Sequence, residues 1–231
     1  MSLKRRIFRT KCNLKTDCCC PDIWQTSFMY NDVYVGKEAE AQQHRILILG
    51  ESHHGTSSST TYVVQHNYFS NPHGVNYRFF ENIVRTFGYD VNDREKFWHK
   101  VYFGNYMDSL CGIQDGVAKN RLKEKGARER LNRDLFAFLS ENKIEYVFCF
   151  SRMVYNNLPS LNKELGDYEV CINPLEVKRY RLDQCVYHPR LSEDISLQNK
   201  VTVYGFLHPS RCYSYNRYQK PVAQILEEIR F

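Results

Sequence analysis

Two short polar clusters in the sequence carry side chains suited to proton transfer and hydrogen bonding. They read Gly50-Glu51-Ser52-His53-His54 and His208-Pro209-Ser210-Arg211. A carboxylate opposite an imidazole suits cleavage of a glycosidic bond. The carboxylate can orient water and offset the positive charge on the sugar, while the histidine hydrogen-bonds the departing anion. We therefore predict that Glu51 and His208 form a catalytic pair.

Each cluster directly follows an apolar run that is typical of a buried β-strand. Four consecutive aliphatic residues at 46–49 end at Gly50, and residues 200–206 form a second apolar run before His208. The carboxyl ends of parallel strands share one edge of a sheet, and ligands bind at that edge in open α/β sheets. The sequence therefore predicts that Glu51 and His208 face one cleft.

The remaining patterns alternate between helix and strand. Apolar residues recur at helical spacing in residues 77–87 and 127–142, and residues 101–103 and 145–150 are β-prone. We expect a further helix from 151 up to Pro159, and a last one at 221–230 that begins with Pro221. Strands that alternate with helices indicate an α/β fold with a mostly parallel sheet.

Length and cysteine usage limit the domain organisation. A chain of 231 residues that is 42% hydrophobic can bury one core, so we expect one α/β domain over residues 44–231, with residues 1–43 packed on it as an extension. Nine cysteines indicate reduced thiols. Four of them crowd the extension, at a spacing that does not suit a metal, so we expect neither metal nor cofactor. They are Cys12, Cys18, Cys19 and Cys20.

Charge indicates the kind of partner. The formal net charge of +6 is compatible with a polyanion such as DNA, and basic residues concentrate at 116–130. That stretch is either a solvated helix face or a phosphate-contacting surface. No run approaches the length of a membrane span, and the basic amino terminus has no hydrophobic region after it. We therefore expect a cytoplasmic monomer that does not contact membranes.

The two clusters, taken with Asn105 between them, resemble the motifs of the uracil-DNA glycosylase superfamily. That family has a Gly and an acidic or amide residue after its first strand, an Asn after its second strand, and His-Pro-Ser after its last strand. The counterparts here are Gly50-Glu51, Asn105 and His208-Pro209-Ser210. The order matches along the chain, and the resemblance covers about residue 45 to the end.

The resemblance implies a three-layer α/β/α fold with a four-stranded parallel sheet, and a base flipped out of DNA into the cleft. It gives Glu51 the role of orienting water, His208 that of stabilising the leaving base, and Asn105 that of reading the base's Watson–Crick edge. Around them, substrate contacts fall on Gly50, Ser52, His53 and His54, and DNA contacts fall on Ser210, Arg211 and Tyr213. An aromatic ring must stack on the base, and the candidates are Tyr62, Phe69 and Phe79.

The sequence departs from the family at several positions. His53 stands where the first motif usually has proline. His54 occupies the next position, whose side chain in the family helps determine whether a 5-methyl pyrimidine can enter the site. The catalytic Asp of the best-known branch would fall on Ser52, so the acidic role rests on Glu51. One branch binds an iron–sulfur cluster through four cysteines spread along the chain, and the crowded cysteines here do not match it.

Three other interpretations remain open. Residues 49–55 also resemble the Gly-Glu-x-His-Gly segment of erythromycin-esterase-like hydrolases. A module of the glycosylase fold that has lost catalysis would bind DNA in a salt-sensitive way without releasing a base. Finally, His208 could cap a turn and Glu51 could be solvated, without a catalytic function.

Overall fold

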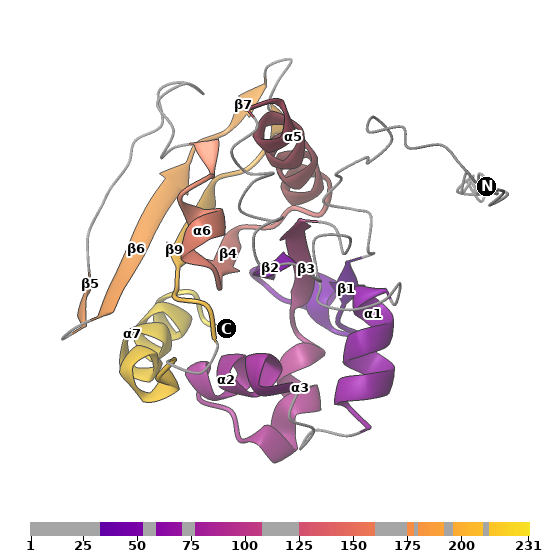
Figure 1. Cartoon of the computed structure of the whole chain (residues 1–231), viewed down its shortest axis with the longest axis vertical. Coiled ribbons are helices and arrows are strands. Elements are labelled where there is room, and N and C mark those ends of the chain that lie inside the picture. Colours follow the sequence, from indigo (N-terminus) through magenta and orange to yellow (C-terminus); the bar gives the residue numbers. More distant parts are fainter. Residues whose placement is uncertain are drawn as a thin grey trace, which may run out of the picture.

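A computed structural model of the chain describes residues 33–52, 59–70, 77–107, 125–159, 175–177, 180–191, 196–209 and 213–231 (Figure 1). Its strands are β1 Tyr34–Val35, β2 Ile46–Ser52, β3 Tyr102–Met107, β4 Tyr146–Cys149, β5 Leu175–Val177, β6 Tyr180–Tyr187, β7 Arg190–Leu191, β8 Ser196–Leu197 and β9 Val201–Gly205. Its helical segments are η1 Ala39–Ala41, α1 Thr60–Tyr62, η2 Val63–Tyr68, α2 Arg78–Thr86, η4 Val91–Asp93, α3 Arg94–Trp98, α5 Lys125–Glu141, α6 Arg152–Tyr155 and α7 Tyr215–Glu228.

Seven of the strands form one mixed sheet in the order β1-β3-β2-β4-β9-β6-β5, and β7 pairs with β8 separately. The neighbours β3, β2, β4 and β9 run parallel, whereas β1, β6 and β5 pair antiparallel at the two sides. The α/β class is therefore confirmed. The expected sheet of four strands is too small, because three antiparallel strands extend it.

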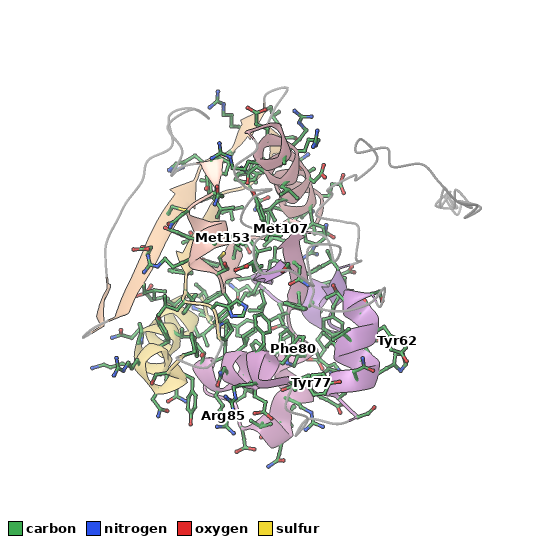
Figure 2. The ribbon with its side chains drawn as sticks, in the orientation of Figure 1. Tyr62, Tyr77, Phe80, Arg85, Met107 and Met153 are labelled. Atoms are coloured by element: carbon green, nitrogen blue, oxygen red, sulfur yellow. The ribbon has the colours of Figure 1, made fainter. Side chains whose placement is uncertain are left out.

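Helices cover both faces of this sheet, which explains the consecutive aliphatic residues of β2. Leu47 and Leu49 pack on the side of α5 and α6, and Ile46 and Ile48 pack on the side of α2, α3 and α7. Figure 1 shows these two groups of helices on opposite sides of the strands. In Figure 2, Met107 and Met153 mark the first side and Phe80 marks the second. A strand that is buried on both faces is apolar at consecutive positions and does not alternate with polar residues.

Several sequence predictions need correction at element ends. The second strand continues to Met107, so Asn105 lies within β3 and not after it. Helix α7 begins at Tyr215, so Pro221 lies inside the helix and does not start it. Burial of Tyr218 on the turn before Pro221 favours this longer helix although proline offers no backbone donor there.

Five strands, β1, β5, β6, β7 and β8, have no counterpart in the sequence predictions. Strand β6 mixes charged and apolar residues, and β1 is only two residues long, so neither gives a clear alternating pattern. Strand β1 lies within the predicted extension, and it pairs with β3 at the edge of the sheet. The boundary at residue 43 and the single domain stay predictions. Among the described residues, no helix combines the length and the apolar character needed to cross a membrane.

Replacing Gly36 with Ala should lower the free energy of unfolding by about 3 kcal/mol, because a crowded site forces backbone shifts. A Cβ on Gly36 would collide with the backbone carbonyls of Trp98 and His99 at the end of α3, which cannot rotate away as a side chain could. Chemical denaturation of the variant measures the loss.

Gly126→Ala is the matched control, because Gly126 is exposed at the start of α5 and a Cβ there meets nothing within 4 Å. Alanine favours helix, so this control should be neutral or stabilising by up to about 1 kcal/mol. Equal stability of the two variants would contradict the close approach at Gly36.

Candidate functional site

The carboxyl ends of β2, β4 and β9 lie side by side at one edge of the sheet. The registers pair Leu49 with Cys149 and Cys149 with Gly205. The ladder continues beyond them, because Phe150 N donates to Leu49 O at 2.8 Å and Phe206 N donates to Cys149 O at 2.8 Å. Adjacent strands are about 4.8 Å apart, so the ends of β2 and β9 are separated by about 10 Å with β4 between them. The two predicted clusters therefore leave the sheet at the same edge.

Glu51 lies at the end of β2 and is held by a residue from the neighbouring strand end. Ser151 Oγ donates a hydrogen bond to Glu51 Oε2 at 2.7 Å. Ser151 itself is only 1% exposed, whereas Glu51 is partly exposed. The buried hydroxyl of Ser151 thus fixes the Glu51 carboxylate, which remains partly exposed to solvent. The sequence offered a signal for Ser151 that we did not use, since it too directly follows a buried strand.

Asn105 is the neighbour of Gly50 across β2 and β3. The register pairs the two residues directly, and the Asn105 side chain is 7% exposed. A Cβ on Gly50 would collide with Asn105 Oδ1. The absent side chain of Gly50 therefore provides the space that the Asn105 amide occupies, one residue before Glu51.

His208 packs against α2 through an aromatic contact. Its ring centroid lies 5.4 Å from that of Phe79, and Phe79 lies 6.1 Å from Phe103 of β3. Phe103 also approaches Gly50, at 3.4 Å from the position of a Cβ. Phe79 therefore contacts both His208, which follows β9, and Phe103 of β3.

The other two candidates for stacking lie elsewhere. Phe69 packs on Tyr34 and on His99, which precedes β3. Tyr62 is 50% exposed and contacts His66 on its own helical segment, and Figure 2 shows it at the periphery. Among the site residues that the structure describes, His208 is in contact with one of the three rings, that of Phe79.

Helix α2 holds the segment after β9 on both sides of residues 210–212. Asn82 Nδ2 donates to Pro209 O at 3.3 Å, and Thr86 Oγ1 donates to Asn82 O at 2.7 Å. The only hydroxyl hydrogen of Thr86 is then used, so Tyr213 donates its own hydroxyl to Thr86 Oγ1, at 2.8 Å. These bonds fix the backbone of Pro209 next to His208 and the ring of Tyr213.

Tyr213 is used for packing in this arrangement. Its ring stacks on Tyr218 of α7 at a centroid distance of 5.2 Å, and burial raises the pKa of its hydroxyl well above the ordinary value. A DNA contact by Tyr213 stays a prediction, and it would have to use the part of the ring that these contacts leave exposed.

Several predicted site residues lie outside the described residues. His53, His54, Ser210 and Arg211 are among them. The cysteines of the extension, for which we expected no metal, also lie outside the described residues, namely Cys12, Cys18, Cys19 and Cys20. So does most of the basic stretch at 116–130. Ser52 is described, and it ends β2 opposite Met107. Among the described residues, no group of three or more His, Cys, Asp or Glu side chains is arranged to hold a metal.

Of the two cysteines in the described residues that are free and buried, Cys149 lies at this edge and is unreactive. Cys149 is the last residue of β4, and burial raises the pKa of its thiol to about 12. A neutral buried thiol is a poor nucleophile. We therefore assign Cys149 to the core.

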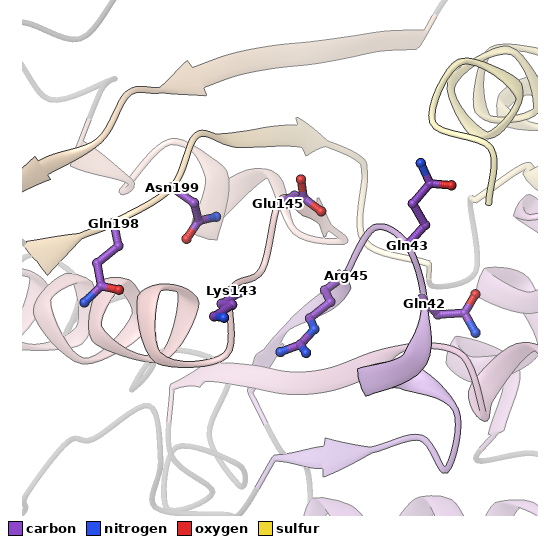
Figure 3. A pocket seen from close by; sticks show the side chains of 7 residues that line it. All are labelled: Gln42, Gln43, Arg45, Lys143, Glu145, Gln198 and Asn199. Carbon is purple, nitrogen blue, oxygen red and sulfur yellow. The ribbon is translucent and has the colours of Figure 1, made fainter.

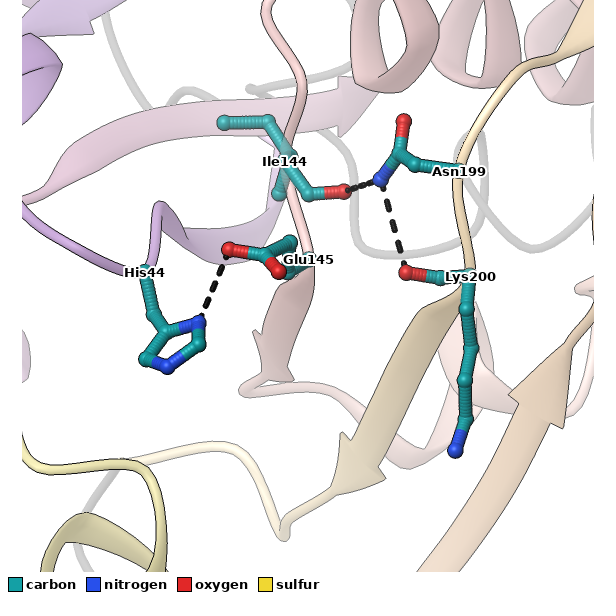
Figure 4. Close-up of polar contacts among 5 residues, drawn as sticks. All are labelled: His44, Ile144, Glu145, Asn199 and Lys200. Carbon is teal, nitrogen blue, oxygen red and sulfur yellow. Dashed lines mark hydrogen bonds and ion pairs between the residues drawn. The ribbon is translucent and has the colours of Figure 1, made fainter.

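A pocket of about 490 Å³ lies at the opposite, amino-terminal edge of the sheet (Figure 3). It is lined by Gln42, Gln43, Arg45, Lys143, Glu145, Gln198 and Asn199. Its polar groups hold the strand beginnings together. His44 bonds Glu145 at 3.0 Å, and Asn199 Nδ2 donates to Ile144 O at 2.6 Å (Figure 4). Arg45 donates to Asn142 O after the last turn of α5 at 2.9 Å. We interpret this edge as structural.

Comparisons with known proteins add no family to this description. No protein-family model matches the chain, and no curated protein matches it.

Proposed function

We propose that this protein is a DNA glycosylase that hydrolyses the N-glycosidic bond of a flipped uracil or another deaminated base. The observation that carries the proposal is that Glu51, Asn105 and His208 lie at one edge of the sheet. Glu51 is bonded there to Ser151 at the start of α6, and His208 packs on Phe79 of α2, which also contacts Phe103. An acid, an amide, an imidazole and an aromatic ring are the groups that binding and releasing a base require.

The catalytic roles follow from charge. The bond breaks through an oxocarbenium-like transition state, in which the sugar gains positive charge and the base gains negative charge. The Glu51 carboxylate orients the attacking water and stabilises the sugar cation. His208, on the other side of β4, donates a hydrogen bond to the departing base and stabilises its negative charge. The gap between the two strand ends separates these roles in space.

Recognition of the base falls to Asn105 and Phe79. The amide of Asn105 carries both a donor and an acceptor, so it can bond the Watson–Crick edge of a base. Phe79 is half-buried in α2, and its position between two other rings suits it to stack on the flat face of that base. Ser210 and Arg211 are then proposed to contact the DNA backbone.

The four parallel strands support a layout like that of the uracil-DNA glycosylases. We infer that β3, β2, β4 and β9 are the counterpart of that family's four-stranded sheet, and that β1, β6 and β5 are additions at its sides. Helices on both faces of the parallel strands fit the same layout. On this interpretation the protein acts in base excision repair, on DNA as its partner.

Base release from end-labelled oligonucleotides, detected as strand cleavage after alkali, tests the proposal. The substrates carry uracil, hypoxanthine or xanthine in single-stranded, matched and mismatched contexts. We expect cleavage at one or more of these bases and none at the unmodified base. The absence of release from every substrate would contradict a glycosylase.

A catalytically inactive module is the alternative that this assay separates. It would bind the same oligonucleotides, with an affinity that falls steeply as salt rises, and would release no base. Absence of both binding and release would favour an ester substrate and the erythromycin-esterase-like interpretation.

A further inference from the structure

We propose that Ser151 is the positioning residue of the catalytic carboxylate. This inference depends on the proposed role of Glu51 and extends it to a residue that the motif resemblance does not include. It starts from the 2.7 Å hydrogen bond from Ser151 Oγ to Glu51 Oε2. A bond from a neutral hydroxyl to a carboxylate is among the stronger hydrogen bonds in proteins.

The direction of the Ser151 hydroxyl is set by the start of α6. Ser151 is the N-cap of that helix, and its Oγ accepts a hydrogen bond from Val154 N at 3.3 Å. The backbone donor occupies one lone pair of the oxygen, and the single hydroxyl hydrogen is left for Glu51. The helix cap therefore orients the donor toward the carboxylate.

Helix α6 is itself held firmly in place. Arg152 forms an ion pair with Asp183 of β6, which is 4% exposed, and the side chains of Val154 and Tyr155 are buried. The ring of Tyr155 lies against Gly205 of β9, where a Cβ would come within 2.6 Å of it. Ser151 thus begins a helix that is fixed by contacts with both β9 and β6. A hydrogen-bond donor that orients a catalytic group needs such fixed surroundings.

This arrangement assigns different tasks to the two carboxylate oxygens of Glu51. Oε2 is held by Ser151, so the plane of the carboxylate is fixed. Oε1 is then the oxygen that accepts a hydrogen bond from the attacking water. Without the Ser151 hydroxyl the carboxylate keeps its charge but loses its fixed orientation, so the rate of the chemical step falls more than substrate binding does.

The test compares Ser151→Ala with wild type on the substrate that the oligonucleotide screen identifies. We expect kcat to fall by about tenfold to a hundredfold, the cost of a misplaced catalytic group, with KM changed by less than about threefold. In a Glu51→Gln background the same substitution should have no further effect on kcat. Ser151→Thr keeps the hydroxyl and should recover most of the activity.

Ser140→Ala is the matched control for loss of a buried hydroxyl. Ser140 is 4% exposed on α5, and its Oγ accepts a bond from Gln198 N at 3.1 Å near the opposite edge of the sheet. It should lower the melting temperature as Ser151→Ala does while leaving kcat unchanged. Equal kcat losses in both variants, or a Ser151→Ala loss that persists undiminished in Glu51→Gln, would overturn the inference.

A melting experiment keeps the failure of this inference distinct from failure of the proposed function. Ser151→Ala and Glu51→Ala should shift the melting temperature less together than the sum of their separate shifts, because they share one contact. Non-additive shifts without base release from any substrate would reject the glycosylase and retain Ser151 as the residue that holds Glu51. Additive shifts would reject the contact itself, whatever the activity.

Discussion

Replacing Glu51 with Gln should lower the rate of base release by about a thousandfold, because the variant keeps the shape of the side chain and loses its negative charge. Without the charge the attacking water is no longer oriented and the sugar cation is no longer stabilised. Single-turnover base release measures the chemical step directly. Substrate affinity, measured by fluorescence anisotropy, should change little, because the charge acts on the transition state and not on the bound base.

Glu145→Gln is the matched control. Glu145 is also partly buried, and it accepts a hydrogen bond from His44 at the amino-terminal edge of the sheet, away from the proposed site. The substitution makes the same chemical change there, and base release should stay within about twofold of wild type. A Glu51→Gln variant with wild-type rates would remove Glu51 from the mechanism and favour a site elsewhere.

Gly50→Ala should reduce base release by about a hundredfold, the cost expected for a misplaced recognition group. The new methyl group would lie 2.4 Å from Asn105 Oδ1, so the amide must rotate away from its proposed position against the base. Its effect on stability should be smaller than that of Gly36→Ala, because a side-chain amide can move and a backbone carbonyl cannot. Single-turnover kinetics and chemical denaturation measure the two effects separately.

The double variant Gly50→Ala/Asn105→Ala makes this prediction sharper. Truncating Asn105 removes the colliding atoms, so the double variant should be more stable than Gly50→Ala alone. It should remain as inactive as either single variant, because all three lack the amide in its position. A fully active Gly50→Ala variant would show that Asn105 does not need its present place and would contradict its role in reading the base.

The strands that are apolar at nearly every position could be predicted from the sequence. Residues 46–49 are all aliphatic, and residues 145–150 and 200–206 are mostly apolar and aromatic. Each stretch forms one of the parallel strands in the middle of the sheet. Their apolar character requires burial on both faces, whatever their neighbours are. The helices at 78–86 and 125–141 were predictable for a similar reason, since one face of each is apolar at helical spacing.

The elements at the sides of the sheet could not be predicted in this way. Strand β6 carries Arg181, Asp183 and Gln184 among its apolar residues, so it has no clear alternating pattern. It is held in place by pairing with β9 and by the ion pair between Asp183 and Arg152, and these partners are distant in the chain. The length of α7 was missed because Pro221 looked like a start signal, while the burial of Tyr218 requires the turn before it to be helical.

The sequence by itself determined that polar residues follow three buried strands, because local composition requires each strand and the break after it. Only the tertiary structure decided which strand ends are neighbours. Strand β4 lies between β2 and β9, so Ser151 reaches Glu51 across a distance of 100 residues in the chain. The same packing brings Phe79 to His208, since that contact depends on α2 lying against the end of β9. Strand order and helix docking are set by long-range pairing, which no local pattern encodes.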